Sequence, residues 1–219
     1  MRETFHGELV ALRELLSRMC EQAATAMRHA SEALLSTDLD AAKQVLAADA
    51  ELDRMRDECE DMAQQMLALQ APVATDLRLV LSAIYCAEKF ERMGDLAEHI
   101  ASATCRVHPD PVVPESLHEV FARLGKVTTN MATQLVSHVT EPRPGAFAEL
   151  NATDHEVDDL HAEVLKRITA TTWSHGIPTA TTLALVARFY ERFADQAVSA
   201  AKRIEFVSTG QTPTHPGSS

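Results

Sequence analysis

The stretch Phe90-Glu91-Arg92-Met93-Gly94-Asp95 recurs one hundred residues later as Tyr190-Glu191-Arg192-Phe193-Ala194-Asp195. A second pair of stretches, Asp49-Ala50-Glu51-Leu52-Asp53 and Asp154-His155-Glu156-Val157-Asp158, is separated by a similar distance. Self-similarity at a fixed offset is typical of a duplicated structural unit. The matched order of the two stretches therefore predicts two related units in one chain.

The chain between these motifs has a helical pattern. Apolar residues recur every three or four positions, as in Leu52, Met55, Cys59 and Met62, which is the spacing of one helix face. Helix-breaking residues divide the chain into six such segments, at Asp38, Pro72, Pro109–Pro114, Pro142–Gly145 and Gly176–Pro178. We expect an all-α fold of six long antiparallel helices, each roughly thirty residues, in two tandem three-helix bundles.

The breaks also predict the domain boundaries. We expect a first three-helix bundle over residues 1–108 and a second over residues 109–209. Residues 210–219 are rich in Pro, Gly and Ser and are predicted to form a disordered tail.

Composition and charge exclude several classes of function. The net charge of −12 argues against binding to nucleic acid, which needs a basic surface, and against adsorption to anionic lipid. No signal peptide precedes the first helix, and the longest apolar stretch, residues 77–87, is too short to span a bilayer. We expect a soluble, cytoplasmic protein whose four cysteines are buried, reduced thiols.

The repeated motifs place pairs of acids on shared helix faces. Glu91 and Asp95 are four residues apart, so they lie on one side of a helix, and the other three pairs have the same spacing. Each Asp pair and the Glu/Asp pair that follows it lie about 30 Å from the turn between their helices, so antiparallel packing brings them to one level. The eight candidate metal ligands are Glu91, Asp95, Glu191, Asp195, Asp49, Asp53, Asp154 and Asp158.

Four converging carboxylates favour a bound cation, because hard oxygen ligands suit Mg²⁺, Mn²⁺, Ca²⁺ and iron; Zn²⁺ is a further candidate. The alternative is a solvated acidic stripe that is balanced by Arg54, Arg56, Arg92 and Arg192. The two sites are expected to be unequal. Glu88 and Glu98 extend the first, whereas Arg188 and Val198 replace them in the second, so acid count predicts more or tighter metal at the first.

Motifs for catalysis are absent from the sequence. There is no Gly-rich phosphate loop and no H-E-x-x-H. Glu3/His6 and Glu115/His118 have the Glu-x-x-His spacing of di-iron bundles, but both lie at helix starts, so chance explains them better. We expect a protein that is not an enzyme, with a carboxylate-metal, di-iron-like enzyme and a metal-free scaffold as alternatives.

The chain resembles the PhoU family of phosphate-signalling regulators. The two Glu-Arg-x-x-Asp motifs carry the resemblance, together with the stretch Leu69-Gln70-Ala71-Pro72-Val73-Ala74-Thr75-Asp76-Leu77-Arg78, which is similar to the family's turn into its third helix. The resemblance covers residues 1–209, and the stretch from Trp173 to Gly176 is reminiscent of actinobacterial members. One departure is Gln196, where relatives often have His, which removes a nitrogen ligand at the second site.

This resemblance implies a fold of two tandem three-helix bundles with multinuclear metal clusters on Glu91, Asp95, Glu191 and Asp195. It implies a negative regulator of phosphate uptake and of the phosphate-starvation response. The implied partners are the ATPase of the phosphate ABC transporter and a sensor histidine kinase. The implied assembly is a homodimer that reaches the membrane only through these partners.

Overall fold

The computed structural model describes residues 2–213 of the chain, and these residues contain helices and connecting loops but no strand. The all-α prediction is thus confirmed. The elements are α1 (Arg2–Ser36), α2 (Leu39–Gln70), α3 (Ala74–Val107), a short 3-10 helix η1 (Glu115–Leu117), α4 (His118–Thr140), α5 (Ala146–Ile168) and α6 (Gly176–Thr209).

Two of the six helices are shorter than predicted. Helices α4 and α5 have 23 residues each, whereas the other four have 32 to 35. Helix α4 starts late because the segment before it contains three prolines, and η1 occupies residues that were expected to be α-helical. Helix α5 ends at Ile168, before a run of threonines that favours irregular structure. Trp173 lies in the loop beyond α5.

Local chemistry sets the sharpest boundary, between α1 and α2. The Asp38 carboxylate accepts hydrogen bonds from the backbone N–H groups of Asp40 and Ala41, at 3.0 and 2.9 Å. These are two of the N–H groups that a helix start leaves without a partner. Helix α2 therefore begins directly after Asp38.

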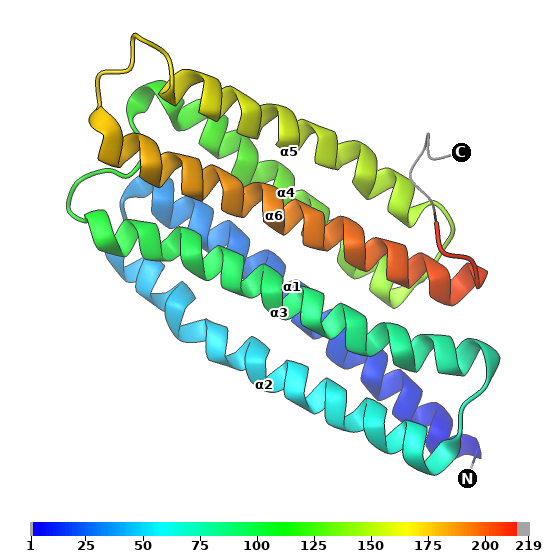
Figure 1. Ribbon diagram of the computed structural model, residues 1–219. Coiled ribbons are helices and arrows are strands. Elements are labelled where there is room, and N and C mark those ends of the chain that lie inside the picture. Colours follow the sequence, from blue (N-terminus) through cyan, green and yellow to red (C-terminus); the bar gives the residue numbers. More distant parts are fainter. Residues whose placement is uncertain (1, 214–219) are drawn as a thin grey trace.

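The two units pack along α3 and α6, which lie side by side at the centre of the molecule (Figure 1). Helices α2 and α5 flank this central pair, and α1 and α4 pack together behind it. The Arg203 guanidinium lies 4.0 Å from the Tyr85 ring, and the Phe189 ring lies 5.1 Å from His99. Since Tyr85 precedes His99 while Arg203 follows Phe189, the two helices are antiparallel. Both Glu-Arg-x-x-Asp motifs lie between these contacts.

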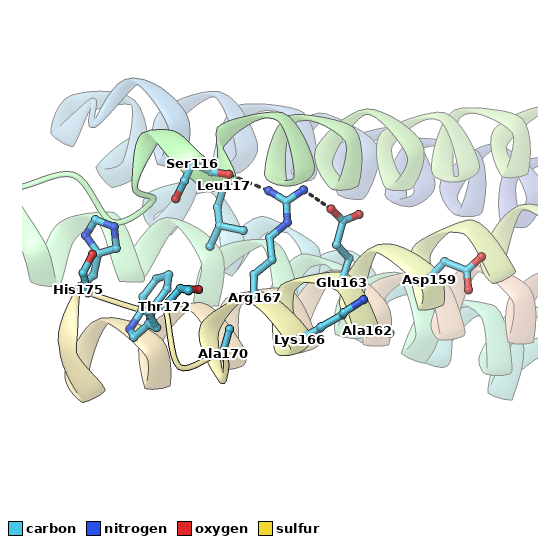
Figure 2. A pocket seen from close by; sticks show the side chains of 12 residues that line it. Ser116, Leu117, Asp159, Ala162, Glu163, Lys166, Arg167, Ala170, Thr172 and His175 are labelled. Atoms are coloured by element: carbon cyan, nitrogen blue, oxygen red, sulfur yellow. Dashed lines mark hydrogen bonds and ion pairs between the residues drawn. The ribbon is translucent and has the colours of Figure 1, made fainter.

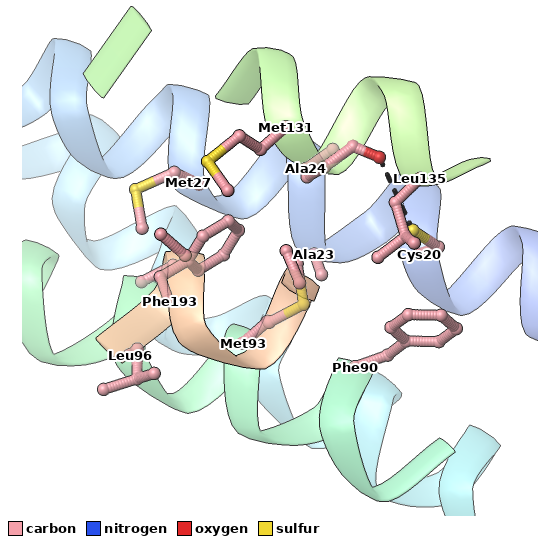
Figure 3. Close-up of a cluster of buried hydrophobic side chains, with 14 of the residues drawn as sticks. Cys20, Ala23, Ala24, Met27, Phe90, Met93, Leu96, Met131, Leu135 and Phe193 are labelled. Carbon is pink, nitrogen blue, oxygen red and sulfur yellow. Dashed lines mark hydrogen bonds between the residues drawn. The ribbon is translucent and has the colours of Figure 1, made fainter. Parts of the chain in front are cut away.

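The two units share one continuous hydrophobic core. Figure 3 shows side chains of α1, α3, α4 and α6 in a single cluster that includes Cys20, Met27, Phe90, Met93, Met131 and Phe193. The Cys20 thiol donates to the carbonyl of Ala132 at 3.6 Å, which links α1 to α4. All four cysteines are free. Cys20, Cys59 and Cys86 are buried, as predicted, whereas Cys105 is only half-buried. The repeat is therefore a duplication in sequence whose halves are fused in space.

Two further predictions concern the tail and the membrane. The predicted tail begins where α6 ends, and Gly210–Pro213 continue as irregular backbone, while residues 214–219 lie outside the described residues. Within residues 2–213, no helix has the length and apolar character needed to cross a bilayer.

Candidate metal sites: two carboxylate clusters

Helix geometry brings the acidic pairs of each unit together. Asp49 and Asp95 each lie 21 residues from the α2–α3 turn (70−49 and 95−74), and Asp53 and Glu91 each lie 17 residues from it (70−53 and 91−74). At the rise of an α-helix, these residues face each other at matched levels. We call Asp49, Asp53, Glu91 and Asp95 the first cluster.

Electrostatics confirms that the members of the first cluster are close. Burial and then the charges of Asp95 and Asp53 raise the pKa of Asp49 to about 6. Burial and then the charge of Asp95 also raise the pKa of Glu91, although Arg56 acts in the opposite direction. Neighbouring carboxylates therefore disfavour one another's ionised forms, as like charges at close range do.

The second unit has the same arrangement, in Asp154, Asp158, Glu191 and Asp195, which we call the second cluster. Burial and then the charges of Asp158 and Asp195 raise the pKa of Asp154 to about 6. Burial is also the main cause of the raised pKa values of Glu191 and Asp195. Glu191 is the most enclosed of the four, at 9% exposed, while Asp158 and Asp195 lie at the exposed rim.

A glycine in the first motif allows α2 to approach α3 closely. A Cβ atom at Gly94 would lie 2.4 Å from Leu52 Cδ1 and 3.5 Å from the Asp49 carboxylate. In the second unit the corresponding residues are Ala194 and Val157. The smaller Val157 accompanies the larger Ala194, so the two units fill equivalent space with different pairs of side chains.

Arginines neutralise most of the first cluster. Arg56 Nη1 of α2 donates to Glu91 Oε1 of α3 at 3.0 Å and lies 3.9 Å from Asp53 Oδ1. Arg92 Nη1 donates to Asp95 Oδ2 at 2.7 Å. Three of the four acids are thus in ion pairs, and one of these pairs spans the two helices directly.

The second cluster is less neutralised. Arg188 donates to Glu191 Oε1 along α6, whereas Asp154, Asp158 and Asp195 have no basic nitrogen within 4.0 Å among the described residues. Two carboxylate oxygens, Asp154 Oδ1 and Glu191 Oε2, are buried without a hydrogen-bond partner. Such atoms are uncommon in folded proteins.

The carboxylate oxygens of the two clusters are the type of ligand that a hard cation prefers. Their side chains, however, are not positioned to share one ion. Among the side chains that the structure describes, no three His, Cys, Asp or Glu groups converge tightly enough to share one ion. The oxygen-only ligands fit a divalent ion, as do the two unpartnered oxygens. The pKa is raised for five of the eight carboxylates: Asp49, Glu91, Asp154, Glu191 and Asp195. Metal binding by these eight carboxylates stays a prediction, and it requires rotation of side chains now paired with arginine.

Two histidines next to the clusters were not singled out from the sequence. His99 follows Asp95 by four residues and opposes the effect of the acids on the pKa of Asp49. His161 follows Asp158 by three residues, and burial, followed by the charge of Arg188, lowers its pKa. Their helical spacing from the motif acids was the available signal.

Glu115 and His118, one of the two Glu-x-x-His pairs, take no part in either cluster. His118 Nε2 donates a hydrogen bond to the Val113 carbonyl at 3.1 Å, and the Glu115 side chain beside it is 95% exposed. The side chain of Glu3 lies outside the described residues. For Glu115 and His118, the interpretation as chance spacing agrees with their position at η1, away from both clusters.

A cavity of about 910 Å³ lies elsewhere, between η1, the end of α5 and the α5–α6 loop. Arg167 crosses it, pairing with Glu163 and donating to the Ser116 carbonyl at 2.9 Å (Figure 2). The Trp173 and His175 rings, which also line it, are in contact with their centroids 4.8 Å apart and their planes tilted by 59°. None of the eight candidate ligands lines this cavity.

The fold and the clusters together define a class: a duplicated all-helical protein with one acidic cluster in each repeat. Comparison with known families identifies the family to which this class of protein belongs. The model of the PhoU domain matches this chain twice, over residues 16–104 and 121–204. The chain therefore belongs to the PhoU family, and the resemblance inferred from the motifs is confirmed.

Curated relatives match along their whole length. The chain is 39% identical to "Phosphate-specific transport system accessory protein PhoU homolog 1" of Mycobacterium leprae, covering 100% of both chains. It is 38% identical to the homolog 2 of Mycobacterium tuberculosis, covering 97% of this chain and 100% of that one.

Solved structures share the fold. The crystal structure of PhoU from Pseudomonas aeruginosa matches with a TM-score of 0.86 at 21% identity, covering 94% of this chain and 100% of that one. The structure of the phosphate transport system regulatory protein PhoU from Streptococcus pneumoniae matches with a TM-score of 0.82 at 24% identity, covering 96% and 99%. At these identities the likeness concerns the fold alone.

Proposed function

We propose that this chain is a non-enzymatic accessory regulator of phosphate transport, which restrains phosphate uptake and the phosphate-starvation response. Membership of the PhoU family and the names of the mycobacterial relatives support the link to a phosphate-specific transport system. The observation that carries the proposal is structural: two carboxylate clusters occupy equivalent places in two fused repeats.

The clusters are proposed to hold divalent or iron-type cations. Asp49, Asp53, Glu91 and Asp95 would bind in the first unit, and their counterparts in the second. A bound ion would neutralise each cluster and offer open coordination positions to an oxygen ligand of a partner. The chain's own contribution is rigid placement, since each cluster is held on two helices that are packed into the shared core.

The proposed partners are the ATPase subunit of the phosphate ABC transporter and a sensor histidine kinase. This chain would couple the transporter to the kinase as a cytoplasmic homodimer, and it would reach the membrane only through them. Its formal charge of −12 fits partners with basic surfaces better than it fits a direct contact with anionic lipid.

Deletion of the gene tests the regulatory role. We expect phosphate-responsive genes to be expressed even when phosphate is plentiful. Unchanged expression would contradict the proposal.

A pull-down of the transporter ATPase and the kinase tests the role of the clusters. Glu91→Gln with Asp95→Asn should weaken capture of at least one partner. The matched control is Glu58→Gln with Asp61→Asn, which removes the same charge at exposed positions of α2. Equal capture by the cluster variant, the control and the unchanged chain would exclude the first cluster from docking.

A further inference from the structure

We propose that the start of α3 and the end of α6 form a docking surface for an acidic protein segment that also carries apolar side chains. The surface consists of Arg78, Leu81 and Tyr85 of α3 with Arg203 and Phe206 of α6, and we call it the arginine–aromatic patch. It contains none of the eight candidate metal ligands. The inference therefore goes beyond the proposed function and does not depend on metal binding.

Helix geometry places these five side chains together. Arg78, Leu81 and Tyr85 follow one another at intervals of three and four residues, which is the spacing of neighbours on a helix surface. Across the antiparallel pair, the Arg203 guanidinium lies 4.0 Å from the centre of the Tyr85 ring, and the Arg78 guanidinium lies 6.0 Å from the centre of the Phe206 ring. Each helix thus contributes one arginine and one aromatic ring.

The contact between Tyr85 and Arg203 holds a guanidinium in place without using its hydrogen-bond donors. A guanidinium packed against an aromatic ring keeps N–H groups at its outer edge. Within the part of the chain that the structure describes, the Arg203 side chain donates no hydrogen bond and has no acidic oxygen within 4.0 Å. Its N–H groups can therefore receive a carboxylate in the bidentate geometry that arginine favours.

Arg78 also has unused donors. Its Nη2 donates to Thr75 Oγ1 at 2.9 Å, its Nε has no hydrogen-bond partner, and no acidic oxygen lies within 4.0 Å of it among residues 2–213. The end of α6 lies against this side chain, since a Cβ atom at Gly210 would be 3.5 Å from Arg78 Cζ. Both arginines of the patch are thus held in place by α3 and α6, and neither is neutralised.

The acids that are nearest along the two helices do not neutralise the patch. Glu88 lies 3.8 Å from Lys89. Asp76 and Glu205 each lie two residues from an arginine of the patch, so helix geometry directs them to a different side, and Glu205 accepts a hydrogen bond from the backbone of α5 at 3.0 Å. In a chain with a net charge of −12, the patch is therefore a local region of positive charge, complementary to an acidic partner.

Exposed apolar side chains accompany these positive charges. Leu81 and Tyr85 are each 46% exposed, and Leu69 and Val73, which lead into α3, are 78% and 74% exposed. These four are half of the eight large hydrophobic side chains that are exposed within the described residues. Tyrosine and arginine are also the side chains that most often dominate binding at protein interfaces. A protein segment with apolar side chains beside its acids would use both parts of the patch, whereas anionic lipid would be repelled by the net charge of the chain.

The repeat shows that the patch is not a by-product of the duplicated architecture. The offset of one hundred residues between the two Glu-Arg-x-x-Asp motifs aligns Arg78 with Pro178, Tyr85 with Leu185, Arg203 with Ala103 and Phe206 with Arg106. At the opposite end of the α3–α6 pair, no arginine packs on an aromatic ring among the side chains that the structure describes. The patch is therefore a second surface, opposite in charge to the clusters and present at one end alone.

Selection from a library of random peptides displayed on phage tests the inference. Peptides are kept if they bind the unchanged chain but not the variant Tyr85→Ala with Arg203→Gln. We expect the kept peptides to combine Asp or Glu with Leu, Ile or Phe, because the patch offers both a positive and an apolar part.

The affinity of the most enriched peptide is then measured by fluorescence anisotropy. Arg203→Gln should weaken binding about tenfold or more, the scale of a residue that dominates an interface. Arg203→Lys keeps the charge but loses the planar guanidinium, so it should recover only part of the affinity. The matched control is Arg106→Gln, which removes one arginine at an exposed position near the other end of α3 and should leave the Kd unchanged. Helical circular dichroism verifies that each variant is folded.

Three results would overturn the inference. The first is a selection that enriches no acidic peptide. The second is a peptide that binds Arg203→Gln as tightly as it binds the unchanged chain. The third is binding to phosphatidylcholine vesicles that contain phosphatidylglycerol, lost in Arg203→Gln, which would assign the patch to a membrane surface instead. None of these results bears on the metal content of the clusters, so the proposed function is tested separately.

Discussion

At the scale of single residues, the two units solve one packing problem with different side chains. Gly94 leaves room for Leu52 in the first unit, and the equivalent pair in the second is Ala194 and Val157. The Asp49 carboxylate lies 3.5 Å from the place where a Gly94 side chain would begin. A larger residue at position 94 would therefore require the Leu52 side chain to shift.

Gly94→Ala should destabilise the protein by about 1–3 kcal/mol, the usual cost of overpacking. Adding Leu52→Val should recover most of the loss, because the double variant reproduces the pair in the second unit. Urea denaturation followed by circular dichroism measures both effects. Equal stabilities of the single and double variants would refute the explanation by volume.

The raised pKa of Asp154 predicts a dependence of stability on pH. Because the folded-state pKa of about 6 exceeds the ordinary aspartate pKa of 3.8, the folded state favours the neutral acid. Its stabilising effect is complete below about pH 3.8 and is lost as the pH rises through about 6. Ionised Asp154 therefore destabilises the metal-free protein at neutral pH.

Asp154→Asn should accordingly raise the Tm of metal-free protein at about pH 7.5 by about 2–4 °C, the shift that about 1 kcal/mol produces in a chain of this size. The gain should vanish near pH 4. Asp159→Asn, an exposed neighbour, is the control and should leave Tm unchanged. A gain for both variants would point to net charge instead of the cluster.

At the scale of helices, most boundaries could be predicted from the sequence, because helix-breaking residues act on the backbone within a few residues. Asp38, Pro72 and Gly176 each mark a helix boundary within a few residues. The late start of α4 and the early end of α5 were missed, because a breaker indicates that a helix stops but does not give the length of the irregular segment, here residues 108–117 and 169–175. The prediction that the paired acids lie at one level along their helices was not affected, because the longer α5–α6 loop compensates for the shorter α5.

The cap of α2 gives a prediction at this scale. Asp38→Ala removes the acceptor for the N–H groups of Asp40 and Ala41 and should cost about 1 kcal/mol. Asp38→Asn keeps an acceptor and should cost little. If the two variants lose equal stability in thermal unfolding, the charge of Asp38 and not the cap would be responsible.

At the scale of the whole molecule, the sequence indicated two units but not how they meet. The pairing of α3 with α6 and of α1 with α4 depends on contacts between side chains far apart in the chain, such as Tyr190 Oη with Ser31 Oγ at 3.0 Å. Periodicity identifies a buried face without naming its partner. Likewise, the spacing of the acids predicted both clusters. That Arg56 joins α2 to α3 at the first cluster depends on side-chain rotamers, which the sequence does not reveal.

One shared core predicts one cooperative unfolding transition. Trp173, the chain's one tryptophan, lies in the second unit, so its fluorescence reports on that unit while circular dichroism reports on all helices. The two urea curves should coincide. A fluorescence midpoint clearly separated from the circular dichroism midpoint would mean that the units unfold independently.

The central claim is that the two clusters hold cations. Metal content, measured by mass spectrometry on protein purified without chelator or affinity tag, tests it most directly. We predict about one equivalent or more of a divalent or iron-type ion per chain, which is lost when all eight carboxylates are replaced by amides. Less than about one equivalent, unchanged by that replacement, would contradict the claim.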